Sequence, residues 1–109
     1  MGGHCPVNQI EELLEQTDLH WYVDDAHGTS IYGNKGEGYI LERLSRKNIS
    51  KVVVTFSLAK GFGATGGGVI VFSPEHEQII RSFGQSYMFS APMDYGAISA
   101  AIKIGRAHV

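Results

Sequence analysis

A β-branched, apolar run that ends in a hydroxyl, a lysine and several glycines constrains the fold of this chain most. The predicted strand covers residues 51–56 and is apolar or β-branched from position 52; Ser57 and Lys60 follow it, and glycines crowd positions 61–68. This pattern favours a buried strand that leads into a loop. Glycine makes up 14 of the 109 residues, about twice the usual share of roughly 7%. Because the glycines concentrate after the strand, we expect a ligand to approach the backbone closely at 61–68.

The rest of the chain alternates helix and strand patterns. The predicted elements are a helix over 6–14, a strand over 20–24, a glycine-rich loop, a helix over about 39–46, strands over 51–56 and 69–72, and helices over 74–83 and 93–102. Ser73 supplies an N-cap hydroxyl for the helix at 74–83, and Pro74 occupies its first position. Because the strands are apolar throughout and alternate with helices, we predict an α/β fold with three layers and a mostly parallel sheet.

Composition limits the class of protein. The chain is long enough for one small domain, and its 43% hydrophobic and 18% charged residues are ordinary for a globular protein. A net charge of −2 gives no electrostatic attraction to nucleic acid or anionic lipid. No apolar run is long enough to span a bilayer, and a single cysteine, Cys5, excludes an internal disulfide. We therefore expect a cytoplasmic protein without a nucleic-acid partner.

Both ends of the chain are unusual for a complete protein. No strand pattern precedes the helix at 6–14. Residues 103–109 break the apolar pattern of 93–102 and can be back-translated into a sequencing-adapter sequence. We interpret residues 1–103 as part of a larger domain of a longer protein, the parent protein, and residues 104–109 as a non-native tail. The alternative for these last residues is a frayed polar tail.

Three side chains near predicted strand ends are candidates for ligand chemistry. Asp24 ends the strand over 20–24 and His27 follows three residues later. Ligands bind outside the carboxyl ends of strands in open α/β sheets, and a carboxylate buried there needs a partner. Lys60 could form an imine with an aldehyde cofactor if its amine lies in a partly desolvated pocket. The plainer interpretations are a solvated charge for Lys60 and a capped loop for Asp24 and His27.

The segments 21–28 and 53–68 resemble the α-oxoamine synthase family of pyridoxal-phosphate (PLP) enzymes. The resemblance spans nearly the whole chain and implies part of the PLP-binding large domain of the aspartate-aminotransferase fold, PLP fold type I. The implied reaction is the decarboxylative condensation of an amino acid with an acyl thioester, from acyl-CoA or acyl carrier protein, by a homodimer. The alternatives are an aminotransferase or lyase of the same fold, or a non-catalytic fragment.

The resemblance implies a role for each candidate residue. Lys60 would bond to the cofactor aldehyde and act as a base, Asp24 would pair with the pyridine nitrogen, and His27 would lie near the phenolic oxygen and the imine. Ser57 would hold the cofactor phosphate, where many relatives carry threonine. The plainer interpretation of Ser57 is a hydroxyl bonded to local backbone. Asp25 corresponds to a variable neighbour that is glutamate in many relatives.

Residues 87–92 resemble a family segment that reaches across the dimer to the partner's cofactor phosphate. Ala91 and Pro92 stand where relatives often have hydroxyl side chains, so only Ser90 could make that contact. The plainer interpretation is an ordinary loop before a helix. Parts of the family fold outside this chain normally supply the group that stacks on the cofactor ring and the arginine that binds the substrate carboxylate.

Two other kinds of site are not expected. Residues 61–66 match the dinucleotide pattern G-x-G-x-x-G, but they lead into a strand pattern and not into a helix. His4, Cys5, His20 and His76 lack the spacing of metal ligands, so we predict no metal site from them.

Overall fold

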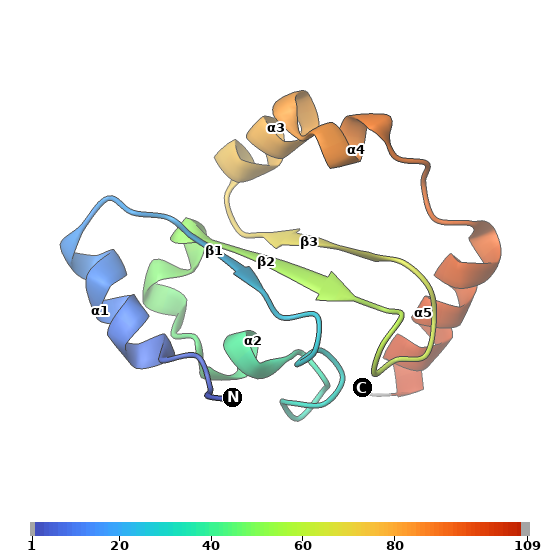
Figure 1. Cartoon of the computed structure of the whole chain (residues 1–109), viewed down its shortest axis with the longest axis horizontal. Helices are drawn as coiled ribbons and strands as arrows, with labels where there is room; N and C mark the ends of the chain where they lie inside the picture. Colours follow the sequence, from blue (N-terminus) through green and yellow to red (C-terminus); the bar gives the residue numbers. More distant parts are fainter. Residues whose placement is uncertain (1, 108–109) are drawn as a thin grey trace.

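The computed structural model describes residues 2–107, which form a small sheet with helices around it (Figure 1). The elements in chain order are α1 (Val7–Gln16), β1 (Trp21–Asp24), α2 (Tyr39–Arg43), the 3₁₀ segment η1 (Arg46–Lys51), β2 (Val52–Ser57), β3 (Gly67–Val71), α3 (Pro74–Phe83), α4 (Gln85–Phe89) and α5 (Tyr95–Ala107). The predicted alternation of helices and strands is therefore confirmed. At α3, the predicted cap is present, because Ser73 Oγ accepts a hydrogen bond from Glu75 N at 3.2 Å.

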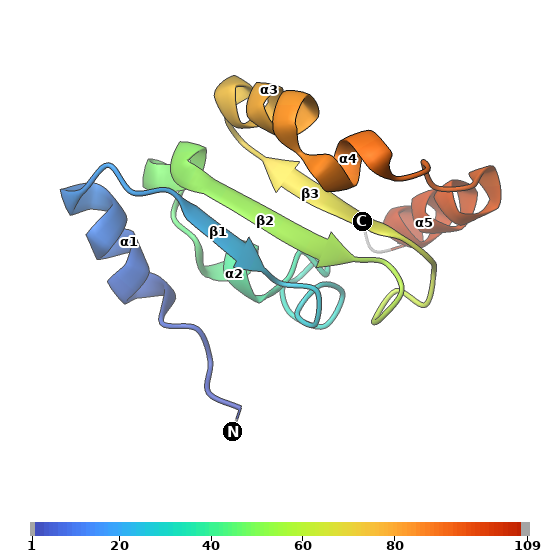
Figure 2. The same cartoon turned by 45° about the horizontal axis from the view of Figure 1, so that its top comes forward.

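The sheet has the order β1-β2-β3 and contains both strand directions (Figure 2). β1 and β2 are parallel, with Asp24 opposite Thr55, whereas β2 and β3 are antiparallel, with Ser57 opposite Gly67. The α/β class is confirmed, but the sheet of the described residues is mixed. Its third strand reverses because residues 58–66 are too few for the crossover that parallel strands require.

Apolar side chains on one face of the sheet form the core. Val52 and Val54 of β2 are buried together with Val7 and Leu14 of α1 and Ile40 of α2. Since side chains alternate between faces along a strand, these positions share one face of β2. Helices α1 and α2 thus cover the sheet from that side.

The opposite face of the sheet is only partly covered. Tyr22 of β1 is 67% exposed and Val69 of β3 is 44% exposed, although α3 contacts β3. Asp24, Thr55 and Ser57 lie on this same face by strand register and alternation. The predicted third layer is therefore incomplete within residues 2–107, and the incomplete side is the one that carries the candidate residues.

Helices α2 and α5 differ most from their predicted bounds. α2 ends at Arg43 because Leu44 is extended (φ −69°, ψ 128°), short of the predicted end near position 46. α5 continues to Ala107, so the expected end of the helical pattern at Ile102 is wrong. The interpretation of 104–109 as a non-native tail stays a prediction, and residues 108–109 lie outside the described part of the chain.

Candidate functional site

The candidate site lies where two neighbouring parallel strands end. Residues 25–38 leave β1 and residues 58–66 leave β2 at the same edge of the sheet, beyond the two arrow tips in Figure 1. The junction is tied together directly, because Asp25 N donates a hydrogen bond to Thr55 O at 3.0 Å. The two loops therefore start side by side.

The two loops pack against each other through glycines. A Cβ atom at Gly61 would lie 1.9 Å from Ser30 Oγ and 3.0 Å from Thr29 O, and one at Gly36 would lie 3.6 Å from the ring of Phe62. Ser30 has a φ of 74°, in the left-handed region that non-glycine residues rarely adopt. Such a conformation persists where the surroundings dictate it. The contact therefore fixes the loop of Lys60 relative to the loop of His27.

Asp24 and His27 both point to the surface of the described chain. Asp24 is exposed, and its Oδ1 accepts a hydrogen bond from Ala26 N at 2.9 Å. This is the capped-loop arrangement of the plainer interpretation, and it leaves the rest of the carboxylate accessible. The imidazole of His27 is also exposed. Both groups are available to a ligand at the end of β1.

Asp25 is the buried member of the acidic pair, at 7% exposure. Its Oδ2 accepts a hydrogen bond from Ile40 N at the start of α2 at 3.0 Å. Burial raises the pKa of the Asp25 carboxyl, and hydrogen bonds from the backbone of Ile40 and Tyr39 oppose that rise. From the resemblance, Asp25 was expected to be only a variable neighbour of Asp24. Strand alternation from Val23 to Asp25 was the signal that could have placed it on the core face.

Ser57 is the last residue of β2, and Lys60 lies in the turn that follows. Ser57 Oγ accepts a hydrogen bond from Ala59 N at 3.2 Å, as the plainer interpretation of this hydroxyl expects. Gly63 N donates to Lys60 O at 2.9 Å, so the main chain turns tightly after the lysine. The Lys60 side chain is exposed, and no group of the described residues forms an ion pair or hydrogen bond with its amine. The amine can therefore meet a ligand.

The glycines of 61–68 are approached mainly by the protein itself. A Cβ atom at Gly66 would lie 2.7 Å from Met93 Sδ, and one at Gly67 would lie 2.4 Å from Phe56 O. At Gly63, in contrast, no atom of residues 2–107 lies within 4 Å of a Cβ atom. Packing explains several of these glycines, and the predicted approach of a ligand to 61–68 stays a prediction.

Ser90 follows directly after α4 and is exposed. Residues 87–89 of the segment with a predicted role across the dimer are helical, and residues 90–94 connect them to α5. The predicted contact of Ser90 with a partner subunit stays a prediction.

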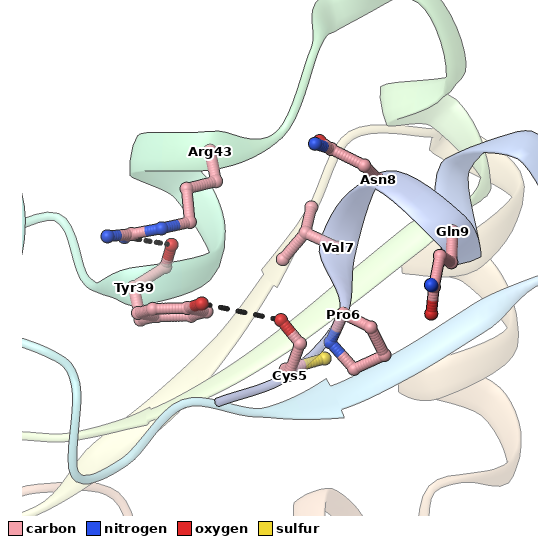
Figure 3. Close-up of a pocket in the computed structure, with 7 residues that line it drawn as sticks. All are labelled: Cys5, Pro6, Val7, Asn8, Gln9, Tyr39 and Arg43. Carbon is pink, nitrogen blue, oxygen red and sulfur yellow. Dashed lines mark hydrogen bonds between the residues drawn. The ribbon is translucent and has the colours of Figure 1, made fainter. Parts of the chain in front are cut away.

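A shallow hollow of about 450 Å³ lies elsewhere, between the start of α1 and α2 (Figure 3). Its lining residues are Cys5, Pro6, Val7, Asn8, Gln9, Tyr39 and Arg43. Tyr39 Oη donates a hydrogen bond to Cys5 O at 3.4 Å, and the Arg43 guanidinium lies 3.8 Å from the centre of the Tyr39 ring. Burial and the charge of Asp25 raise the pKa of the Cys5 thiol. None of the predicted site residues lines this hollow.

Two histidines that the sequence places far apart meet in the structure. His20 Nδ1 lies 2.6 Å from His76 Nε2, and His76 Nδ1 is buried without a hydrogen-bond partner within the described chain. This pair was not predicted, because the spacing of the two histidines along the sequence gives no sign of it. Residues 2–107 contain no group of three or more potential metal ligands, and none of their helices is long and apolar enough to cross a membrane.

Comparison with known proteins decides the family. The family model described as aminotransferase class I and II matches residues 1–106. The chain belongs to the class I and II aminotransferase family. This family member is 31% identical over 105 residues to the 8-amino-7-oxononanoate synthase of Arabidopsis thaliana, covering 93% of the chain and 21% of that protein. It is 30% identical over 107 residues to the synthase of the same name from Marinomonas sp. (strain MWYL1), covering 94% of the chain and 26% of that protein.

Solved structures share this fold. A structure titled as SPT with PLP internal aldimine superposes with a TM-score of 0.79 at 22% identity, covering 98% of the chain and 26% of that structure. The 8-amino-7-oxononanoate synthase of Francisella tularensis gives a TM-score of 0.68 at 26% identity, covering 92% and 29%. The resemblance stated from segments 21–28 and 53–68 is thus confirmed. This class I and II aminotransferase family member spans about a quarter of the length of the curated relatives it matches.

Proposed function

We propose that the parent protein is a PLP-dependent acyltransferase that condenses an amino acid with an acyl thioester and releases carbon dioxide. The observation that carries the proposal is that Asp24 and Ser57 end two adjacent parallel strands and that Lys60 follows shortly after Ser57. The identity to 8-amino-7-oxononanoate synthases supports this reaction over amino-group transfer. The described chain would contribute only part of the active site.

The residues present fit PLP in their donor chemistry. The chain offers an exposed amine at Lys60, an exposed carboxylate at Asp24, a hydroxyl at Ser57 and an exposed imidazole at His27. Lys60 would bond to the cofactor aldehyde, Asp24 would hold the pyridine nitrogen and Ser57 would bind the phosphate. Ser90 would contact the phosphate bound to a partner subunit. When bound, PLP supplies an electron sink for negative charge at the Cα atom of the amino acid.

The side chains of this chain would then act as binding and proton-transfer groups. The negative charge of Asp24 favours a protonated pyridine nitrogen beside it. The Lys60 amine, when not bonded to the aldehyde, would accept the proton from the substrate Cα atom and return it. His27 would donate a hydrogen bond to oxygen atoms that gain negative charge.

The proposal extends to assembly and location. The exposed position of Ser90 beyond α4 supports a homodimer in which this segment faces the partner's site. A single cysteine and an ordinary charge balance support a cytoplasmic protein.

The test is a reaction assay on the parent protein with PLP. Glycine, alanine or serine would be offered with several acyl thioesters, and free thiol would be followed beside keto-acid formation. Thiol release that depends on both substrates and disappears in Lys60→Ala supports the proposal. Amino-group transfer to a keto acid without thiol release would overturn the acyltransferase assignment and support an aminotransferase.

A further inference from the structure

The main chain of Asp25 joins β1 to β2 and organises the turn that follows. Its N–H donates to Thr55 O at 3.0 Å, and its carbonyl oxygen accepts from Gly28 N at 3.1 Å and Thr29 N at 3.0 Å. The hydroxyl of Thr29 donates to the same carbonyl at 2.8 Å. Asp24 and His27 lie within this bonded segment. Their positions therefore depend on how Asp25 is held.

The Asp25 side chain provides the second attachment, to α2. Gly38 precedes this helix and has no side chain that could cap it. The buried Asp25 carboxylate accepts from Ile40 N at 3.0 Å instead, although the two residues are far apart in sequence. A carboxylate at a helix start satisfies a free N–H group and interacts favourably with the helix dipole. Asp25 thus connects the end of β1 to a helix that belongs to the core.

Two glycines, Gly28 and Gly38, make room for the Asp25 carboxylate. A Cβ atom at Gly28 would lie 2.1 Å from Asp25 Oδ1, and a Cβ atom at Gly38 would lie 2.4 Å from Asp25 Oδ2. Both separations are far below any real contact, so larger residues at these positions would displace the carboxylate. The loop is shaped around this side chain.

We propose that Asp25 is a positioning residue, whose buried carboxylate locks the turn of Asp24 and His27 onto β2 and α2 and so sets how both side chains face the cofactor. Because side chains alternate along the strand, anchoring Asp25 on the core face keeps Asp24 on the opposite, ligand-facing side. Asp25 thus holds the turn in place, and Asp24 is left to face the cofactor. This inference rests on the proposed PLP site but not on the acyltransferase reaction.

The experiment compares variants of the parent protein with PLP bound, at a temperature where each is folded. Asp25→Ala removes the anchor, and Asp25→Asn keeps its shape and an oxygen acceptor. Glu37→Gln is the matched control, because Glu37 is an exposed carboxylate of the same loop that accepts from Lys35 N at 2.9 Å. The readouts are hydrogen exchange at the Ile40 amide, the pH dependence of the bound cofactor's absorption band, and kcat and KM for the amino acid.

The expected result separates positioning from stability alone. Asp25→Ala should lose protection at the Ile40 amide, shift the pH dependence of the band and lower kcat by roughly 10²-fold, since misplacement of catalytic groups by about 1 Å has effects of that size. KM should change less. Asp25→Asn should recover most of the loss, and Glu37→Gln should match the wild type. A folded Asp25→Ala variant with a wild-type band and kcat would overturn the proposal.

A second variant covers the case in which Asp25→Ala does not fold. Gly28→Ala keeps the carboxylate but displaces its Oδ1 atom, and it should reproduce the shifted band and the lower kcat. A wild-type band and kcat in folded Gly28→Ala would overturn the proposal. Failure of thiol release would be a separate result, because the band and the Ile40 exchange report on Asp25 whichever reaction the parent protein catalyses.

Discussion

The hydroxyl group of Ser30 occupies the space in which a side chain at position 61 would begin. A Cβ atom at Gly61 would lie 1.9 Å from Ser30 Oγ, and the carbonyl oxygen of Thr29 lies 3.0 Å from the same point. The residue after Lys60 must therefore be small. Two loops that belong to different strands are held together at this contact.

We predict that Gly61→Ala destabilises the parent protein by about 1–3 kcal/mol, the usual cost of overpacking. Ser30→Gly should reduce that cost, because it removes the colliding hydroxyl. Chemical unfolding of the two single variants and the double variant measures their coupling. Gly63→Ala is the control, since its site is open but has a φ of 65°, so its cost should not change with Ser30. An equal cost of Gly61→Ala in both backgrounds would contradict the contact.

Lys60 should be the lysine that carries PLP in the parent protein. Two other amines of the chain are engaged: Lys51 Nζ donates to two backbone carbonyl groups at 2.6 and 2.8 Å, and Lys47 pairs with a glutamate at 3.2 Å. Borohydride reduction should fix the cofactor to the peptide that contains Lys60. Mass spectrometry that finds the adduct on Lys35, Lys47 or Lys51 would show the assignment to be wrong.

Asp24→Asn should lower kcat strongly, by about 10²-fold or more, with little change in unfolding temperature. The side chain is exposed, and the amide oxygen of asparagine can still accept from Ala26 N, so the loss should come from charge alone. Asp25→Asn should reduce kcat much less. Steady-state kinetics and thermal unfolding of the two variants check this. Equal reductions of kcat at both positions would remove the support for Asp24 as the partner of the pyridine nitrogen.

The pH dependence of the unfolding free energy should show the effect of burying the Asp25 carboxyl. Burial raises its pKa above the usual value of 3.8, so the native state holds this proton more tightly than the unfolded state. The contribution of Asp25 to stability is then fully present below that value and lost as pH rises through the native pKa. Relative to Asp25→Asn, the wild-type parent should therefore lose unfolding free energy as pH rises above about 4.

Glu37, in the same loop, should make a contribution to stability that changes with pH in the opposite direction. Hydrogen bonds from its own backbone N–H and from that of Lys35 lower its pKa. The contribution of Glu37 to stability is present above the usual glutamate pKa and is lost as pH falls. The unfolding free energy of the wild type, relative to that of Glu37→Gln, should therefore decrease at low pH. Urea unfolding across this pH range measures both differences. Slopes of the same sign for Asp25 and Glu37 would contradict the burial of Asp25.

The chain made alone should be only marginally stable. β1 and β3 form the two edges of the sheet among the described residues, and large apolar side chains such as Tyr22, Phe83 and Tyr95 are 67%, 78% and 90% exposed. Unpaired edges and exposed apolar surface favour association over folding. Calorimetry should show no cooperative transition for the monomeric chain, and a cooperative transition would refute this prediction.

Local sequence patterns predicted which segments form helices and strands. Contacts between residues far apart in sequence determined where α2 ends and which side chains meet, and local patterns do not show these contacts. The pattern over 39–46 favours a helix, but Ser45 N and Ser45 Oγ both donate to Glu11 Oε1 at 2.7 Å. This contact with α1 outweighs local helix propensity and accompanies the early end of α2. The approach of His20 to His76 likewise depends on where α3 packs after the sheet has formed. Spacing along the chain carries no information about such a pair.

At the site, sequence alone placed Asp24 and Ser57 at strand ends and Lys60 just beyond, because each apolar run stops at a polar residue. Strand alternation could have placed Asp25 on the core face, but the sequence could not assign the hydrogen-bond partner of its carboxylate. That assignment requires the position of α2, which is set by packing of Ile40 into the core. Nor could it show that Ser30 faces Gly61, since this depends on the register between β1 and β2.

Because β3 runs antiparallel to β2, the turn of Lys60 and the turn of Asp24 should form at different times during folding. Residues 58–66 are closed by short-range bonds from Leu58 N to Gly66 O at 2.9 Å and from Ala64 N to Leu58 O at 2.8 Å. A hairpin of this kind forms within microseconds, whereas pairing of β1 with β2 must first close a much longer stretch of chain. We expect the turn of Lys60 to form early and to act as the template on which the turn of Asp24 later docks.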